Sequence, residues 1–449
     1  MPKNSVKTVV TIGPASDSVQ MIKILLEKGA DVFRLNASHN DLDYHKRIIE
    51  RIRSLEKLMK LDIPILLDLP GPKLRTGKVK EGKVNLKIGE VYTFGPNADI
   101  EISSSIINKI RIGDTIKLSD GKFELKVISR TDSTFRAKSL DYGQLLEDQS
   151  INCEHLTYEK EYPTERDREI IRFGLENGVN CFGLSFVSSA KDVMNVRKLT
   201  GEDSILVSKI ERPDAVKNLK EILSCTDVVM VARGDLGLNV DISKLPEMQR
   251  SMIALANQAH KPVIVATQML ESMVANPIPT RAEVNDVFTA IYEGTDAVML
   301  SEESAVGNYP IKSFVMLKKL IDSFDNKIIQ KPTYKMENEE DGIADAAVLL
   351  SERINVNNIL VLTSLGGSAF RLSRYHSDKR IFAATDKKST FYRLSFGRNI
   401  YPLLFPSLDG FKGEAMHKIK NLTDADKIIV LSDSFVEGHK AKAISLLYL

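Results

Sequence analysis

The feature that most constrains the fold is a unit that repeats along the chain: a short apolar run ends in polar residues, and a helix-like stretch separates it from the next run. Strands that alternate with helices imply right-handed crossovers and a parallel α/β sheet. Runs that are apolar throughout fit strands buried on both faces. There are eight of them, the number that closes a (β/α)8 TIM barrel. They are Val6–Ile12, Asp31–Leu35, Ile63–Leu67, Asn180–Leu184, Ile205–Ile210, Asp227–Val231, Pro262–Ala266 and Asp296–Leu300.

One interval breaks this rhythm. Between Pro70 and about Ile151, short alternating strands are separated by turn signals such as Glu81-Gly82 and Ile112-Gly113-Asp114. This pattern predicts a small all-β domain, a β-barrel, inserted after the third barrel strand. An insertion at the carboxyl end of a barrel strand lies over the active-site face, where a mobile lid belongs.

A second change of character follows the eighth unit. The charged segment Asn326–Gly342 predicts a linker, and beyond it helix-like and strand-like runs alternate again, as at Ala344–Glu352 and Ile359–Leu362. This indicates a separate open α/β domain. We therefore expect the barrel in residues 1–69 and 153–328, the lid in residues 70–152 and the C-terminal domain in residues 340–449.

Composition excludes several classes of protein. The formal net charge is +2 and no long basic run is present, so a nucleic-acid partner is not expected. The N-terminus lacks a signal-peptide core, and no apolar stretch reaches membrane-spanning length, so no membrane association is expected. The 3 cysteines, Cys153, Cys181 and Cys225, lack metal-ligand spacing, as in a reduced cytoplasmic protein.

The segment S-I-L-V-S-K-I-E-R, from Ser204 to Arg212, is the most informative of the eight strands. Because side chains alternate along a strand, Lys209 and Glu211 share one face at its end. The carboxyl ends of barrel strands carry the catalytic residues. A cation and an anion at this position suit a metal-bridged anionic substrate. The alternative is a simple ion pair that caps the strand.

The ends of other strands add acids, cations and hydroxyls. Glu211 and Asp235 together offer two oxygens to a Mg²⁺ ion that keeps waters and substrate ligands. Gly234 lets a ligand approach the backbone beside Asp235, although a tight surface turn is the alternative. Arg34 is suited to clamp a phosphate or carboxylate, unless it forms a structural ion pair. Thr267 is suited to position a proton, unless its hydroxyl only bonds the local backbone.

Together these residues describe a site for phosphoryl transfer, where positioning and charge neutralisation supply most of the catalysis. The chain has neither a Walker-type loop nor a convincing G-x-G-x-x-G motif, so neither a P-loop nor a dinucleotide fold accounts for a nucleotide site.

Six blocks of sequence resemble the pyruvate kinases, and the resemblance covers nearly the whole chain. The blocks are S-I-L-V-S-K-I-E-R-P-D-A-V, V-A-R-G-D-L-G, K-P-V-I-V-A-T-Q-M-L-E-S-M, P-T-R-A-E-V-N-D-V, R-L-N-A-S-H and D-L-P-G-P-K-L-R-T-G. The resemblance implies transfer of the phosphoryl group of phosphoenolpyruvate to ADP, the last step of glycolysis. It also implies a cytoplasmic homotetramer whose C-terminal α/β domain is regulatory.

The resemblance assigns roles to particular residues. Lys209 would stabilise the phosphoryl group in transfer and the enolate, and Arg34 would hold the phosphate. Glu211 and Asp235 would hold Mg²⁺, the Gly234–Asp235 backbone would receive the substrate carboxylate, and Thr267 would lie where the enolate is protonated. The nucleotide side would consist of Asn36, His39 and Arg75, with a second Mg²⁺ on ADP. By itself, His39 is more typical of a packed or solvent-facing histidine.

The chain departs from the family pattern at several positions. Lys73 stands where many members have a glutamate and require potassium. Its ammonium is expected to replace that cation, so we predict activity without K⁺, although Asn36, Ser38 and Asp68 stand at the usual cation position. The other departures, which put secondary contacts in question, are Pro70, Arg166, Glu302 and Val306.

A glycine-containing turn in the C-terminal domain resembles the family's effector phosphate loop. It reads T-S-L-G-G-S-A, and its candidate binding residues are Thr363, Ser364, Gly366, Gly367 and Ser368. Backbone amides at such a helix start bind phosphate, which predicts a phosphorylated allosteric effector. The alternative is an ordinary strand-to-helix turn.

Two other functions compete with this interpretation. A Mg²⁺-dependent C–C lyase barrel would need neither a lid nor an effector domain. A catalytically silent homologue would be expected to lack the lysine or a metal-binding acid, whereas Lys209, Glu211 and Asp235 are all present.

Overall fold

The eight predicted strands close into one parallel barrel in the computed structural model, which describes residues 6–119, 121–153, 161–324, 334–407, 412–423, 425–436 and 439–449. Each strand pairs with its neighbours in chain order, and the first pairs with the last. Each predicted run overlaps its strand, with ends that differ by at most two residues. The strands are β1 (Lys7–Ile12), β2 (Val32–Asn36), β3 (Ile65–Asp68), β11 (Cys181–Leu184), β12 (Ile205–Ile210), β13 (Val228–Ala232), β14 (Val263–Ala266) and β15 (Ala297–Leu300).

Helices cover the outside of the barrel, and their apolar faces form one large core with the outer faces of the strands. Side-chain caps fix where several helices begin. Asp41 caps α2, and Thr164 and Thr280 form capping boxes at α4 and α10. These helices are α1 (Val19–Glu27), α2 (Leu42–Met59), α4 (Glu165–Glu176), α5 (Ala190–Thr200), α6 (Pro213–Lys217), α7 (Leu219–Cys225), α8 (Arg233–Asn239), α9 (Leu245–Gln258), α10 (Arg281–Tyr292), α11 (Glu302–Ala305) and α12 (Pro310–Phe324). Short 3-10 turns lie at η2 (Ile242–Lys244) and η3 (Glu271–Val274).

The described residues of the inserted domain are all-β apart from the short helix α3 and the 3-10 turn η1, as predicted, but the strands do not form a single continuous barrel sheet. A five-stranded sheet has the order β10-β6-β7-β8-β5, and β4 pairs with β9 in a separate two-stranded sheet. Isolated bridges such as Val79 to Ile100 connect the remaining backbone. The elements are η1 (Lys80–Gly82), β4 (Lys83–Leu86), β5 (Val91–Phe94), α3 (Ser104–Ile107), β6 (Thr115–Leu118), β7 (Phe123–Arg130), β8 (Phe135–Ser139), β9 (Gly143–Leu146) and β10 (Ile151–Asn152).

The C-terminal part is an open five-stranded sheet in the order β18-β17-β16-β19-β20, in which only β20 is antiparallel to its neighbour. The predicted linker lies partly outside the described residues, and its last residues belong to the first helix, which Asn338 caps. The elements are α13 (Glu339–Arg353), β16 (Asn358–Leu362), α14 (Gly367–Ser373), β17 (Arg380–Thr385), α15 (Lys388–Leu394), β18 (Ile400–Leu404), α16 (Lys412–Thr423), β19 (Lys427–Val436) and β20 (His439–Tyr448).

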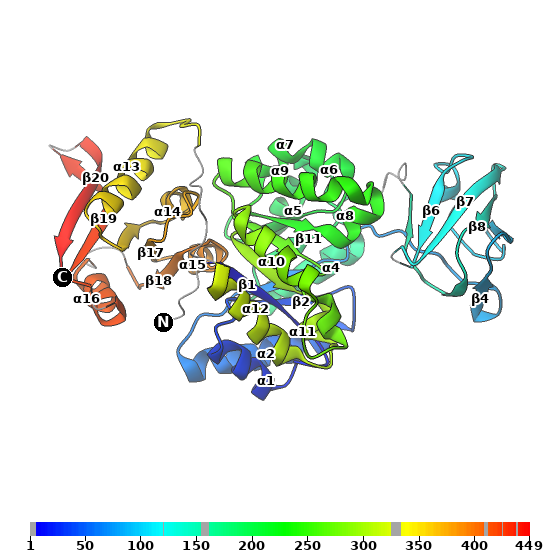
Figure 1. The fold of residues 1–449 in the computed structure, drawn as a ribbon, viewed down its shortest axis with the longest axis horizontal. Helices are drawn as coiled ribbons and strands as arrows, with labels where there is room; N and C mark the ends of the chain where they lie inside the picture. Colours follow the sequence, from blue (N-terminus) through cyan, green and yellow to red (C-terminus); the bar gives the residue numbers. More distant parts are fainter. Residues whose placement is uncertain are drawn as a thin grey trace.

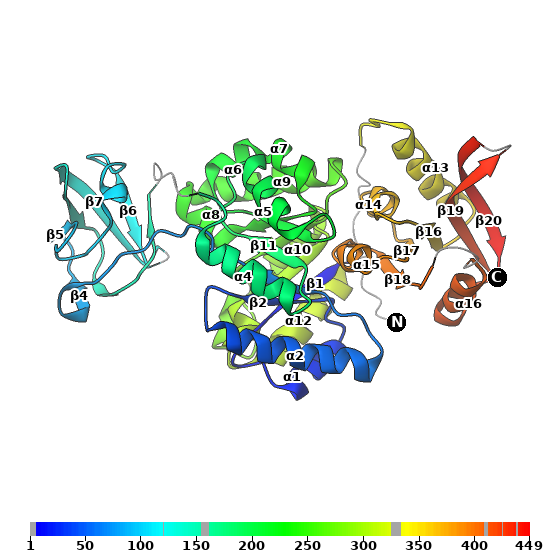
Figure 2. The same ribbon diagram turned by 180° about the vertical axis from the view of Figure 1, so that it is seen from behind.

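The insert and the C-terminal domain lie on opposite sides of the barrel (Figures 1 and 2). The insert follows β3 and therefore stands at the carboxyl ends of the strands. The C-terminal domain closes the other end, because Tyr392 and Phe396 of the α15 region join the core inside the barrel. Among the described residues, no helix combines the length and apolar character that a membrane crossing needs.

Candidate active site

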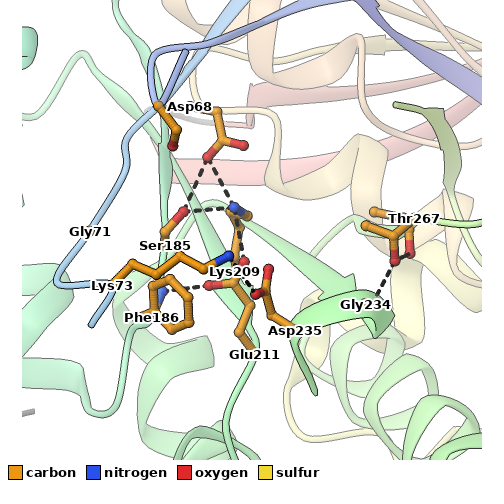
Figure 3. A network of polar contacts seen from close by, with 12 residues as sticks. Asp68, Gly71, Lys73, Ser185, Phe186, Lys209, Glu211, Gly234, Asp235 and Thr267 are labelled. Atoms are coloured by element: carbon orange, nitrogen blue, oxygen red, sulfur yellow. Dashed lines mark hydrogen bonds and ion pairs between the residues drawn. The ribbon is translucent and has the colours of Figure 1, made fainter. Parts of the chain in front are cut away.

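Lys209 is the centre of the site at the carboxyl end of the barrel. Its Nζ donates to Ser185 Oγ at 2.6 Å and lies 3.2 Å from Asp68 Oδ1 and 2.9 Å from Glu211 Oε1. These partners come from the ends of β3, β11 and β12, so barrel closure alone brings them together (Figure 3). Burial lowers the pKa of Lys209, but Asp68 and Glu211 outweigh it and raise the pKa above its ordinary value. Lys209 is therefore a fixed, charged ammonium.

Arg34 completes what we call the ion cluster, which consists of Arg34, Asp68, Lys209 and Glu211. Its Nε and Nη2 donate to Asp68 Oδ2 at 2.8 and 2.5 Å, and its Nη1 donates to Thr11 Oγ1 at 3.0 Å. Burial raises the pKa of Asp68, but Lys209 and Arg34 outweigh it and hold that pKa below its ordinary value. The structural ion pair considered for Arg34 is thus present, and it lies inside the predicted site.

Two glycines leave room for this arrangement. A Cβ on Gly183 would lie 2.8 Å from Asp68 Oδ1, so a larger residue would displace the carboxylate. Gly71 has a positive φ of 66°, and a Cβ there would lie 2.6 Å from the carbonyl oxygen of Ser185. The chain that leaves β3 for the insert therefore runs directly over the serine that holds Lys209.

Glu211 carries a buried carboxylate whose two oxygens have different surroundings. Its side chain is fully buried, and its Oε2 accepts from the backbone N–H of Phe186 at 2.6 Å. Its Oε1 is near Lys209 but makes no aligned hydrogen bond. Burial raises the pKa of Glu211 to about 7, and the charge of Asp235 adds to this effect while Lys209 opposes it. A second positive charge beside Glu211 would lower its pKa and favour the ionised carboxylate.

Asp235 faces Glu211 from the first turn of α8 (Figure 3). The side chain of Asn239 holds the two backbones together, donating to Asp235 O at 2.8 Å and to Glu211 O at 3.3 Å. Within the described residues, no group of three or more acidic, histidine or cysteine side chains forms a closed metal site. The carboxylate oxygens of Glu211 and Asp235 are ligands of the type that Mg²⁺ prefers.

Lys73 reaches this pair from the start of the insert. Its Nζ lies 3.3 Å from Asp235 Oδ1, so the lysine contacts the predicted metal-binding acid. Lys73 also lines an open cleft of about 450 Å³ between the insert hinge and α4. The other residues that line the cleft are Gly71, Pro72, Glu161, Thr164, Glu165 and Arg166.

Thr267 lies beside the first turn of α8, away from the ion cluster (Figure 3). Its Oγ1 accepts from the backbone N–H of Gly234 at 2.8 Å and donates to Ala266 O at 2.5 Å. The local backbone bonding considered for this threonine is therefore present. It also connects Thr267 to the glycine predicted to receive a substrate carboxylate.

Of the predicted nucleotide residues, Asn36 pairs with Asp68 across the β2–β3 ladder and so borders the ion cluster, whereas His39 and Arg75 are exposed. Asn36 Oδ1 accepts from the N–H of Ser38 at 3.2 Å, and His39 is exposed in the same turn. Arg75 is exposed near the start of the insert, where its Nη1 donates to Asp148 O at 2.7 Å. These residues lie at the rim of the site and on the insert.

Comparison with known proteins gives one consistent result. The families described as "Pyruvate kinase, barrel domain" and "Pyruvate kinase, alpha/beta domain" match residues 3–314 and 341–439. A pyruvate kinase of Thermotoga maritima is 37% identical over 412 residues, which cover 89% of this chain and 88% of that protein. One of Thermoplasma acidophilum is 34% identical over 440 residues, 97% of this chain and 78% of that protein. The crystal structure of a pyruvate kinase from Cryptosporidium parvum matches with a TM-score of 0.89 at 28% identity, covering 99% of this chain and 96% of that one.

The chain belongs to the pyruvate kinase family. It is a phosphotransferase, and both the predicted fold and the predicted family are confirmed. The C–C lyase interpretation is therefore set aside.

Three contributors to this pyruvate kinase site were not predicted as site residues. Ser185 and Thr11 hold Lys209 and Arg34, and Phe186 donates its N–H to Glu211. Ser185 and Thr11 stand at strand ends, where a polar residue after an apolar run is a usable signal. Phe186 acts through its backbone in a left-handed conformation with φ of 59°, which no side-chain pattern reveals.

The departures from the family pattern lie outside the ion cluster. Arg166 lines the cleft and its Nη1 donates to Glu169 Oε2 at 2.6 Å, and Val306 is 54% exposed. Glu302 is exposed at the start of α11, and Pro70 is half-buried after β3. The enzyme's central ion pairs therefore do not involve them.

The buried Glu211 predicts how stability without metal depends on pH. Its pKa rises from 4.5 in the unfolded chain to about 7 in the native protein. Between these values the native state holds a proton that the unfolded state has lost, so the free energy of unfolding falls as pH rises. In chelator, the thermal midpoint of the wild type should fall more steeply from pH 5 to about 7 than that of Glu211→Gln, and the two slopes should agree at higher pH.

The control for this measurement is Glu202→Gln, which removes an exposed carboxylate. It should follow the wild type. Parallel curves for wild type and Glu211→Gln across the whole range would contradict the raised pKa.

Proposed function

We propose that this enzyme uses Mg²⁺ to transfer the phosphoryl group of phosphoenolpyruvate to ADP, producing ATP and an enolate that takes up a proton at C3 to become pyruvate. The observation that carries the proposal is the Lys209 ammonium, held by Ser185, Asp68 and Glu211 at the carboxyl end of the barrel. A rigid, buried positive charge stabilises negative charge that develops in a transition state and requires no reorganisation to do so.

The proposed roles of Lys209 and Arg34 follow from the partners that hold their side chains in place. Lys209 faces the bridging oxygen and the transferring phosphoryl group, where it neutralises charge on the enolate as the P–O bond breaks. Arg34 holds the phosphate with the N–H groups that do not engage Asp68 or Thr11. Because both side chains are buried among fixed partners, substrate binding does not have to order them.

Glu211 and Asp235 are the proposed protein ligands of Mg²⁺. When bound, the ion would neutralise phosphate and carboxylate charge on the substrate. The N–H groups of Gly234 and Asp235 would receive the substrate carboxylate. The Gly234 N–H donates to Thr267 Oγ1 in this structure, so the carboxylate would share or replace that bond. Thr267 then lies where the enolate carbon receives its proton, through water.

Asn36, His39 and Arg75 are the proposed nucleotide contacts, with a second Mg²⁺ carried by ADP. Their positions at the rim and on the insert suit a lid that closes over the nucleotide. The predicted domain limits, cytoplasmic location and homotetramer are proposals that rest on family membership.

The direct test is pyruvate formation from phosphoenolpyruvate and ADP with Mg²⁺, in the wild type and in Lys209→Met. The variant should lose about 10³-fold or more in kcat, because an uncharged side chain cannot stabilise the enolate. Mg²⁺ binding, followed by calorimetry, should persist. A folded wild type that binds Mg²⁺ but makes no pyruvate would indicate a silent homologue.

We also propose that the enzyme is active without K⁺. Lys73 already supplies a positive charge 3.3 Å from Asp235. Lys73→Glu, which introduces the glutamate of potassium-requiring members, should lower activity about tenfold or more in K⁺-free buffer and make it respond to added KCl. Lys78→Glu, an exposed position in the insert, is the matched control. Strong stimulation of the wild type by K⁺ would refute this proposal.

Thr363, Ser364, Gly366, Gly367 and Ser368 form the proposed effector phosphate loop. The Thr363 hydroxyl accepts from the Gly366 N–H at 2.8 Å, and Gly366 has a positive φ of 83°. Close by, Glu340 binds both Arg371 and Lys442, at 2.9 and 2.6 Å. A phosphorylated ligand would compete with this carboxylate for the two cations.

The test is a calorimetric panel of sugar phosphates and nucleotides, together with the cooperativity of phosphoenolpyruvate saturation. A binding ligand should shift cooperativity in the wild type and lose affinity in Ser368→Asp, which places a negative charge in the loop. Ser224→Asp, on an exposed barrel position, is the control. Absence of binding by the entire panel, with unchanged cooperativity, would count against the loop.

A further inference from the structure

Thr267 has a backbone conformation that a β-branched residue rarely adopts. Its φ is 71°, and the next residue, Gln268, also has a positive φ, of 54°. Such conformations are strained, and they persist only where surrounding contacts determine them. Thr267 therefore needs a restraint from outside its own loop.

The side chain of Arg233 supplies this restraint. Its Nη2 donates to the carbonyl oxygen of Thr267 at 2.7 Å. Its Nη1 donates to Asp286 Oδ1 on α10 at 2.7 Å and approaches Gln249 Oε1 on α9 at 3.5 Å. The guanidinium is buried and held on two sides, so it fixes the carbonyl in one direction.

The residue after Arg233, Gly234, binds the side-chain hydroxyl of Thr267. The Gly234 N–H donates to Thr267 Oγ1, whereas Arg233 donates to the Thr267 carbonyl oxygen. Two consecutive residues at the start of α8 therefore bind the side chain and the backbone of Thr267. Asp235, the proposed metal ligand, is the next residue in the same turn. The turn therefore sets the position of the hydroxyl relative to the metal site.

We propose that Arg233 is a positioning residue for proton transfer: through the Thr267 carbonyl, its guanidinium, which Asp286 holds, sets the direction of the hydroxyl that serves the enolate carbon. The inference rests on the proposed role of Thr267. Arg233 acts without contacting the substrate, so its loss impairs protonation while leaving the ligands of the metal and the phosphate in place.

A purely structural role for Arg233 predicts something different. In that case the ion pair between Arg233 and Asp286 only ties α8 to α10, and its loss lowers thermal stability and affects all partial reactions alike. Exchange of the pyruvate methyl protons with solvent deuterium separates the two roles, because it reports enolisation without phosphoryl transfer to substrate. It is followed by NMR in the presence of Mg²⁺ and ATP.

The experiment compares five forms of the full enzyme with the wild type: Arg233→Met, Arg233→Lys, Asp286→Asn, Thr267→Ala and the double variant Arg233→Met/Thr267→Ala. Arg233→Met should slow exchange by about 10- to 100-fold, since small misplacement of a catalytic group has effects of that size. Arg233→Lys and Asp286→Asn should have intermediate rates. The KM for phosphoenolpyruvate and the affinity for Mg²⁺ should change less than about threefold.

The double variant decides whether Arg233 acts through Thr267. Adding Arg233→Met to Thr267→Ala should slow exchange little further, because the group that it positions is already absent. Equal slowing in both backgrounds would overturn the proposal, as would unchanged exchange in Arg233→Met. If Arg233→Met fails to fold, Arg233→Lys and Asp286→Asn are each combined with Thr267→Ala and compared in the same way.

The outcome for Thr267→Ala alone distinguishes this inference from the proposed function. Wild-type exchange in that variant would remove Thr267 from proton transfer and overturn the positioning role with it. Phosphoryl transfer that depends on Lys209 would still stand in that case.

Discussion

Most of the site depends on the burial of four charges at the carboxyl end of the barrel, the ion cluster of Arg34, Asp68, Lys209 and Glu211. Charges removed from water must be paired, and loss of one partner leaves the others uncompensated. Asp68 satisfies this condition with two cations, and its pKa falls. Burial raises the pKa of Glu211 to about 7, although Lys209 opposes this effect. This raised pKa, next to Asp235, supports the proposal that Glu211 and Asp235 share a divalent cation.

The barrel and the main part of this cluster could be predicted from the sequence because both follow from local periodicity. Continuous apolar runs predicted all eight strands, and alternation along β12 placed Lys209 and Glu211 on one face. The pairing of Arg34 with Asp68 required the register between β2 and β3, which no local pattern contains. Helix breaks are not visible in the local pattern either: the helical stretch after β12 is divided at Asn218, which ends α6 and begins α7.

Contacts between distant parts of the chain were the least predictable. Lys73 and Asp235 are 162 residues apart, and their approach depends on how the insert leaves the barrel. The antiparallel edge strand β20 was missed, and so were the aromatic residues of the α15 region that fill the opposite end of the barrel. Thr390, which lies in α15, donates its Oγ1 hydrogen to Ser364 O at 2.8 Å. The α15 region therefore contacts both the core inside the barrel and the proposed effector loop.

The insert has a comparable link to the site from the other side. Lys73, at its first turn, pairs with Asp235 on α8, and a Cβ on Gly121 would lie 2.5 Å from Leu238 on the same helix. The insert therefore touches α8 near both ends of that helix, and α8 also holds Thr267 through Arg233 and Gly234. Closing of the insert as the proposed lid would change the distance between Lys73 and Asp235 on this helix. The seven-residue helix α8 thus contacts the insert through Lys73 and carries Asp235, the proposed metal ligand. Its first two residues also hold Thr267.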